Sequence, residues 1–440
     1  MAVSLYRVTK VGPARVGAGE AASPTEFKYA AFVSESIPRV VRWSFLLFIF
    51  TIPFEDQSFS FISGSLTRMV GLLFFALYIL YYNTLLSKRS FAHPSKALWW
   101  FAGYFAIRGL HGIFIIYSYG IFPIPEEMLR SAYRTSMFTL LQLIFFFWIA
   151  CDLLKGKMAR NACLVFSISS LIVAVSSIFF GTAYGERVTV MGSNPDTLGV
   201  QMAFTMIILT GLHLTAGPKD FMRSILLLTA LTFPPLTLML KTGSRAAIVV
   251  LITGYLVYIL PIVSVKSRWI GGIVVAVAGI AAAVYLAAGS SMYSERWKQA
   301  YYEGSFSRRD KIYAHSIEMI LERPVFGWHP ILHMYELGSR TGYPEMSEHS
   351  LVLSLLAGDG LVGTIPFLLG LWVCTRKAWE ARKGELRLLP LALMVATLTS
   401  NLTDSFTDRK SFWFVLALVV ADASVGVQKK VILFGRTRAD

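Results

Sequence analysis

Two arginines lie in short polar connections between long apolar runs, and both are candidates to bind an anion. Arg187 lies in GERVTVMGSNPDTLG, where glycines and an Asn-Pro pair predict a turn followed by the start of a helix. Arg245 lies in TGSRAA, where a Gly-Ser pair permits a tight turn. A guanidinium group binds phosphate through two parallel hydrogen bonds and stays charged. The alternative for each arginine is a cation that lies among lipid head groups, and the spacing leaves both interpretations open.

A histidine at the start of a later apolar run is the candidate base. His349 follows Glu348 and directly precedes the run that begins at residue 350. Imidazole titrates near neutral pH and can take a proton from a hydroxyl group. A metal site is the alternative, because His329 and His333 are four residues apart. The sequence has no HExxH pattern, however, and Pro330 interrupts the helix that would align the pair. We therefore expect a metal-independent base at His349, with no metal ion and no cofactor.

These histidines belong to one large polar insert, residues 289–349, which holds seven of the 41 Lys and Arg residues and four of the seven His. Within it, residues 307–322 are predicted to form an amphipathic helix, because apolar residues recur at helical spacing. These apolar residues are Ile312, Tyr313, Ile317, Ile320 and Leu321. Pro324 is expected to end the helix. Arg309, near its start, is a third candidate ligand for an anion, and a solvated charge is the alternative.

The composition excludes a soluble globular protein. Of the 440 residues, 55% are hydrophobic and 15% are charged, and the mean hydropathy is +0.58. Apolar runs of about 20 residues recur along the chain, as α-helical membrane proteins require. The runs are continuous rather than alternating, which excludes a membrane β-barrel. The net charge of +15 is interpreted as a topology signal, so nucleic acid is not an expected partner.

About twelve transmembrane helices are predicted in one domain. The candidate spans are 41–54, 66–86, 97–118, 136–154, 161–181, 197–214, 225–240, 246–264, 269–288, 350–374, 388–404 and 411–426. Residues 1–40 form a polar N-terminal tail without the apolar core of a signal peptide. Residues 41–288 hold nine spans, 289–349 the long loop, 350–426 three spans and 427–440 the C-terminal tail.

The Lys and Arg distribution predicts the orientation of these spans. With both termini cytoplasmic, the tails and inner loops hold 25 Lys and Arg, against 8 in the outer loops other than the long insert. Positive charge concentrates on the cytoplasmic side of a membrane. We therefore expect both termini to be cytoplasmic and the long loop to be periplasmic or external.

Few ionisable or reactive side chains lie inside the predicted spans. Asp359, about ten residues into the tenth span, is expected to be paired or to face a cavity. Cys151, Cys163 and Cys374 have no CxxC spacing, so we interpret them as small hydrophobic residues.

Four of these segments, taken in order, resemble the bacterial O-antigen ligase and polymerase superfamily. They are ERVTVMGSNPD, TGSRAA, SRRDKIY followed by RPVFGW, and EHSLVLSLLAGDGLVG. The family pattern has Pro-Asn, Gly-Trp-Gly and His-Asn where this chain has Pro-Asp, Gly-Trp-His and His-Ser. The candidate arginines and the histidine match the pattern.

The resemblance implies an inverting, metal-independent glycosyltransferase of the GT-C type in the bacterial inner membrane. It would move a glycan from an undecaprenyl diphosphate carrier to an acceptor hydroxyl, with Arg187, Arg245 and Arg309 on the diphosphate and His349 as the base. The leading hypothesis is a ligase that joins O-antigen polysaccharide to a lipid A–core sugar at the periplasmic face. The expected partners are this donor, this acceptor and membrane lipids. The alternatives are a polymerase of lipid-linked glycan or a ligase for another acceptor. A transporter is disfavoured by the lack of evident internal repeats.

Overall fold

A computed structural model describes residues 38–56, 65–82, 95–117, 126–184, 187–190, 192–216, 221–259, short pieces between 277 and 298, 309–405 and 407–436. The described residues are mostly helical. The elements up to the first hairpin are α2 (Arg39–Thr51), η1 (Ile52–Phe54), α3 (Leu66–Leu80), α5 (Lys96–Tyr117), α6 (Glu126–Leu153), α7 (Lys157–Phe180), β1 (Gly181–Tyr184) and β2 (Arg187–Val190). Those that follow are α8 (Pro195–Ala216), α9 (Phe221–Lys241), α10 (Arg245–Ile259), α13 (Arg309–Glu322), α14 (Leu332–Thr341), α15 (Leu351–Ala381), α16 (Leu389–Ser400) and α17 (Lys410–Arg436).

Several of these helices have the length and composition of membrane spans. Among the described residues, four helical segments qualify: Glu127–Leu153, Lys157–Ser177, Pro195–Thr215 and Leu351–Ala381. Four shorter helices are also apolar: Leu66–Leu80, Leu226–Lys241, Arg245–Ile259 and Leu389–Ser400. A helix satisfies its own backbone hydrogen bonds, which lipid cannot do. The chain is therefore a mostly helical, multi-pass membrane protein, while the number of twelve spans and the GT-C architecture stay predictions.

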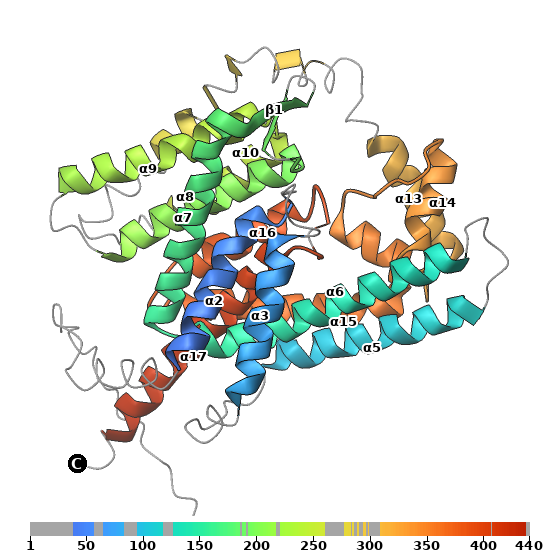
Figure 1. The fold of residues 1–440 in the computed structure, drawn as a ribbon, viewed down its shortest axis with the longest axis horizontal. Coiled ribbons are helices and arrows are strands. Elements are labelled where there is room, and N and C mark those ends of the chain that lie inside the picture. The colour runs from blue at the N-terminus through green and yellow to red at the C-terminus, as the bar shows by residue number, and fades with distance from the viewer. Residues whose placement is uncertain are drawn as a thin grey trace, which may run out of the picture.

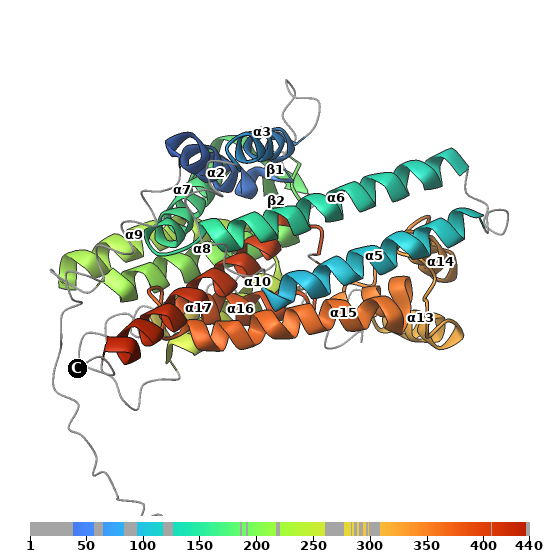
Figure 2. The ribbon, with the colours of Figure 1, turned by 90° about the horizontal axis from the view of Figure 1, so that it is seen from below.

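The helices α5, α6 and α15 run side by side, and α13 and α14 lie together at one end of them (Figures 1 and 2). Aromatic side chains fill the space between these long helices. Phe101 on α5 has its ring centroid 5.4 Å from that of Phe147 on α6, 5.5 Å from Phe367 on α15 and 5.0 Å from Trp413 on α17. One buried residue thus ties four helices together.

The helix predicted in the polar insert is present, but its buried face differs from the predicted one. α13 ends at Glu322, just before Pro324, as expected. Its buried residues are Ile312, Ser316 and Met319. Two residues that the apolar pattern included, Ile317 and Leu321, are 50% and 73% exposed. The reason is that Ile312 and Met319 pack on Trp328 and Leu337, which belong to the following turn and to α14, an element that the sequence did not predict.

The long helix α15 is broken at Gly360, where φ is 61° and ψ is −168°. The turn after α13 makes hydrogen bonds with the backbone groups around this break. Leu361 N and Val362 N donate to the carbonyls of Pro324 and Val325, at 2.9 and 3.1 Å. Trp328 N and His329 N donate to the carbonyls of Ala357 and Gly358, at 2.7 and 2.8 Å. The polar insert is therefore joined to the helix that begins directly after His349.

Candidate functional site

His349 lies at the entrance to α15, where the sequence predicted it. α15 begins at Leu351 with Ser350 as its N-terminal boundary residue. His349 has φ = 51°, a left-handed conformation that non-glycine residues seldom adopt. Leu351 N donates to the carbonyl of Asn401 at 2.9 Å, which ties the start of α15 to the connection between α16 and α17. The candidate base therefore lies beside the connection between α16 and α17, which is distant from it in the sequence.

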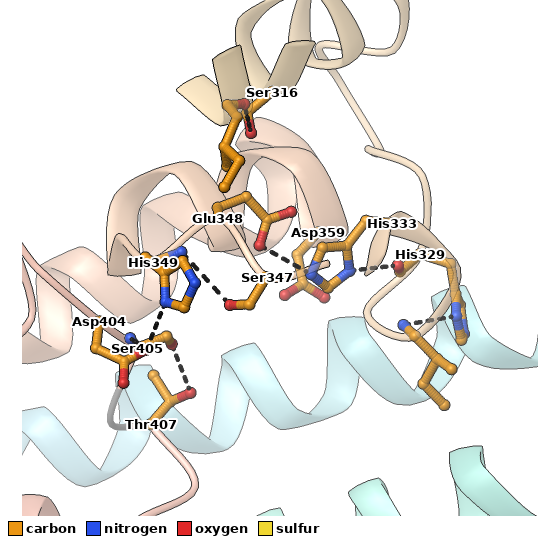
Figure 3. A network of polar contacts seen from close by, with 12 residues as sticks. Ser316, His329, His333, Ser347, Glu348, His349, Asp359, Asp404, Ser405 and Thr407 are labelled. Carbon is orange, nitrogen blue, oxygen red and sulfur yellow. Dashed lines mark hydrogen bonds and ion pairs between the residues drawn. The ribbon is translucent and has the colours of Figure 1, made fainter. Parts of the chain in front are cut away.

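The connection between α16 and α17 carries the partner of His349. The imidazole Nδ1 lies 3.6 Å from Oδ1 of Asp404, and the two side chains are 38% and 29% exposed (Figure 3). Asp404 is held in turn, because its amide donates to the carbonyl of Ser400 at the end of α16. Ser405 N also donates to Oδ1 of Asp404, at 2.9 Å. The carboxylate of Asp404 therefore faces one ring nitrogen of His349, at a distance somewhat longer than a hydrogen bond.

Glu348 points away from His349, into the interior of the insert. Its Oε2 lies 3.4 Å from Nε2 of His333 on α14 (Figure 3). Both side chains are almost completely buried, with exposed fractions of 0% and 6%. Burial alone would lower the pKa of His333, but the attraction of the Glu348 carboxylate outweighs it and raises that pKa. Burial would likewise raise the pKa of Glu348, but His333 lowers it below its ordinary value. The two groups therefore form an ion pair.

The other histidine of the i, i+4 pair faces a different set of side chains. His329 has φ = 91° and its ring lies 5.6 Å from that of His111 on α5 and 5.7 Å from that of Tyr133 on α6. Burial, together with the nearby His111, lowers the pKa of His329 to about 3. His333 Nδ1 instead contacts the carbonyl of His329, at 3.0 Å. In the described part of the chain, no three His, Cys, Asp or Glu side chains are grouped to hold a metal ion.

Arg187 begins the second strand of a short hairpin, which the sequence did not predict. β1 and β2 pair antiparallel, with Tyr184 opposite Arg187. The Arg187 side chain is partly buried, and its Nη2 lies 2.7 Å from Oδ1 of Asp196 at the start of α8. Its Nε donates to the carbonyl of Thr242, at 2.6 Å. The guanidinium group thus bridges the start of α8 and the short connection that leads into α10.

Arg245 is the first residue of α10 and is partly exposed. Only residues 242–244 separate it from α9, and Gly243 makes the turn with φ = 63°. Thr242, the partner of Arg187, lies three residues before Arg245. The structure therefore brings the two predicted anion-binding segments together. The predicted tight turn is confirmed.

Arg309 is the first residue of α13 and is partly exposed. α13 packs against α14 and α15. Among the described residues, no hydrogen bond or ion pair joins Arg309 to Arg187, Arg245 or His349. Its contribution to a common site stays a prediction.

A small pocket is lined by residues of α8 and α16, and neither Arg187 nor His349 is among its lining residues. Thr197 and Gln201 of α8 line it on one side, and Thr397 and Ser400 of α16 line it on the other. Thr197 directly follows Asp196, the partner of Arg187. Ser400 accepts the backbone hydrogen bond of Asp404. The pocket thus has one lining residue next to Asp196 in sequence and one that is hydrogen-bonded to Asp404.

Asp359 is both paired and beside a cavity, as the sequence predicted. Its Oδ2 accepts a hydrogen bond from the hydroxyl of Tyr104 at 3.0 Å and lies 3.8 Å from Nη1 of Arg108. It also lines a cavity of about 710 Å³ between α5, α15 and the turn after α13. This cluster stabilises an acid inside the bundle and lies apart from His349.

Two residues of the site, Asp404 and His333, were missed from the sequence. Asp404 is one of two acids in NLTDSFTDRK, and no local pattern connects it with a histidine 55 positions earlier. His333 was considered only as a metal ligand. The adjacency of Glu348 and His349 was visible, but their opposite directions follow from the left-handed backbone at His349.

Comparison with known families finds one match. Residues 228–368 match the sequence model of the O-antigen ligase family. The matched range includes Arg245, Arg309 and His349, while Arg187 precedes it. A search of curated proteins finds no match to the chain. The segment that carries the candidate base and two of the three candidate arginines thus matches the O-antigen ligase family, within a multi-pass membrane protein.

Proposed function

We propose that this protein transfers O-antigen polysaccharide from undecaprenyl diphosphate to a sugar hydroxyl of lipid A–core. The reaction would take place at the periplasmic face of the bacterial inner membrane, in a GT-C-type, inverting and metal-independent enzyme. The observation that carries this proposal is the His349–Asp404 pair at the mouth of α15, whose histidine lies in the segment that matches the O-antigen ligase family.

His349 acts as the general base in this proposal. With Nδ1 directed at Asp404, the neutral ring carries its proton on Nδ1 and its lone pair on Nε2. The acceptor hydroxyl loses its proton to Nε2 while its oxygen bonds to the anomeric carbon of the donor sugar. The bond from that carbon to the phosphate oxygen breaks, and the electron pair leaves with undecaprenyl diphosphate. Asp404 stabilises the imidazolium, as the acid does in other base–acid pairs.

The arginines bind the leaving group. A diphosphate that gains charge in the transition state needs fixed cations, and guanidinium groups supply them without a metal ion. Arg187 and Arg245 suit this role because Arg187 bonds to the segment that carries Arg245. Arg309 is the third proposed ligand. The start of α10 adds the favourable field of a helix N-terminus for an anion.

Deletion of the gene in its native bacterium tests the proposal. Loss of a ligase should leave undecorated lipid A–core while carrier-linked polymer accumulates. Loss of a polymerase should instead leave lipid A–core that carries single repeat units, and this result would replace the proposal with its alternative. Purified protein should also transfer glycan with no ion gradient or nucleotide. A requirement for either would indicate a transporter.

A further inference from the structure

Four large apolar side chains of α13 and of the turn after it are exposed and form an apolar edge. Ile317, Leu321, Val325 and Phe326 are 50%, 73%, 47% and 62% exposed. The first three are spaced four residues apart, so they follow one face of α13 and the turn after it. The opposite face is already filled, because Ile312 and Met319 pack on Trp328. A helix in water does not expose four large apolar side chains in a row without a partner.

The hydrogen bonds at the break in α15 fix the depth of this edge relative to the membrane. Arg376, 76% exposed, marks the polar end of the α15 span. About 20 apolar residues cross a membrane, so the opposite boundary of the hydrocarbon lies near Ala357. Leu361 N and Val362 N, which bind the carbonyls of Pro324 and Val325, lie four to five residues beyond it. At 1.5 Å per residue this is roughly 6–8 Å inside the boundary.

A second helix gives the same depth. α5 begins at Lys96, next to the exposed Trp99 and Trp100, which is typical of a membrane interface. A span of about 20 residues from Lys96 reaches the other boundary near residue 116. Leu110 lies about six residues short of it, roughly 9 Å inside. Leu110 lines the same cavity as Val325 and Phe326, so the turn after α13 faces a part of α5 that lies inside this boundary.

The apolar edge also continues the surface that the spans present to lipid. On α5, Leu110 and Ile113 are 60% and 50% exposed, and on α15, Leu361 and Ile365 are 47% and 52% exposed. The cavity that joins the two surfaces is lined mainly by apolar side chains, among them Ile107 and Val362. Two charged residues, Arg323 and Asp359, also line the cavity, and Arg323 stacks on Trp328 at 4.0 Å.

We propose that α13 is an interfacial helix whose edge of Ile317, Leu321, Val325 and Phe326 is inserted into the lipid leaflet on the side of His349. The depth of roughly 6–9 Å is within the range of about 5–10 Å over which amphipathic helices bury their apolar faces. The occupant of this surface is lipid. The polar insert is therefore not entirely a water-facing loop, and its lipid contact holds α13, α14 and the His333–Glu348 pair at a fixed height.

Spin labels at single cysteines test this inference. The starting variant has Cys151, Cys163 and Cys374 replaced by alanine, and labels are placed by Leu321→Cys and Phe326→Cys. Ile365→Cys on α15 is the lipid-facing control, and Ser339→Cys, exposed on α14, is the water-facing control. The protein is studied in nanodiscs that hold one chain each, so that a second copy cannot cover the surface.

Collisions with oxygen, which concentrates in lipid, and with a water-soluble nickel chelate are then compared. We expect the labels at 321 and 326 to match the label at 365, with a nickel collision rate several-fold lower than at 339. Nickel rates equal to that at 339 would overturn the inference, as would protection that appears only when several chains share a vesicle. The readout does not depend on glycan transfer, so its failure is distinct from failure of the proposed function.

Discussion

Nε2 of His333 lies 3.4 Å from Oε2 of Glu348, and this buried ion pair directly precedes the candidate base. Glu348 is held inside the insert. The left-handed backbone of His349 turns the imidazole of His349 itself toward Asp404. His333 is itself fixed, because its ring packs on Gly358 of α15 and contacts the His329 carbonyl. We therefore expect this pair to position His349.

Breaking this pair should destabilise the protein. Glu348→Gln leaves a charged or unpaired His333 in the interior, which costs about 3–5 kcal/mol of unfolding free energy. Replacing both partners, as in His333→Phe with Glu348→Leu, should cost less than Glu348→Gln alone. The surface pair His315–Glu318, at 3.0 Å, is the matched control. Glu318→Gln should cost about 0–1 kcal/mol. Equal losses in the buried and the exposed pair, measured by denaturant unfolding, would contradict the positioning role.

The same pair predicts a window of pH in which the protein is most stable. The pKa of Glu348 is lowered from 4.5, so its contribution is present above pH 4.5 and is lost as the pH falls through the lowered value. The pKa of His333 is raised from 6.5, so its contribution is present below pH 6.5 and is lost as the pH rises through the raised value. The Tm of the wild type minus the Tm of the His333→Phe/Glu348→Leu variant should be largest inside this window. A difference that stays constant across both pKa values would show that the pair is not ionised.

The contacts of Arg187 separate a phosphate-binding role from a structural one. Arg187→Ala and Arg245→Ala should each lower transfer by about 10²–10³-fold, as expected for loss of one donor to a developing anion. Arg187→Lys should recover little, because an ammonium lacks the two-pronged geometry. Asp196→Asn is the control, since it keeps the shape of the partner of Arg187 but removes its charge. Transfer by Asp196→Asn near the wild-type rate supports phosphate binding. A loss as large as that of Arg187→Ala, at equal membrane abundance, would assign Arg187 a structural role.

The close contact between the insert and the break in α15 predicts different effects at two left-handed glycines. At Gly327 (φ = 68°) an added Cβ would lie 2.6 Å from the carbonyl oxygen of Gly358, whereas at Gly342 (φ = 81°) nothing lies within 4 Å. Gly342→Ala should therefore cost about 1–2 kcal/mol, from backbone strain alone. Gly327→Ala should cost more, since the turn must also move away from α15. Unfolding free energies decide the comparison, and equal costs would contradict the close contact.

The sequence predicted the class of fold because membrane helices leave a strong local signal. Apolar runs marked α6, α7, α8 and α15, and Pro324 marked the end of α13. The hairpin of Arg187, the helix α14 and the break at Gly360 were not predicted. Each depends on a distant partner, such as the loop carbonyls that bind the backbone of α15 around Gly360.

The site was predictable to the same extent. His349 and the two short arginine segments stand out as polar residues beside apolar runs, so their positions at helix ends followed from the sequence. Asp404 could not be predicted, because it meets His349 only in the folded structure, where Leu351 N donates to the carbonyl of Asn401. The sequence pattern placed Ile317 and Leu321 on one apolar face with Ile312. Helical spacing alone cannot show which apolar residues face protein and which face lipid.

The turnover of purified His349→Gln, which keeps hydrogen-bonding capacity but cannot act as a base, tests the central claim most directly. Binding of the lipid-linked donor, measured on the same preparation, is the control for folding, because the arginines supply that binding. We predict that donor binding persists and that the rate of glycan transfer falls by about 10²–10⁴-fold, the usual contribution of a general base. Transfer within a few-fold of the wild-type rate would contradict the assignment of His349 as the catalytic base.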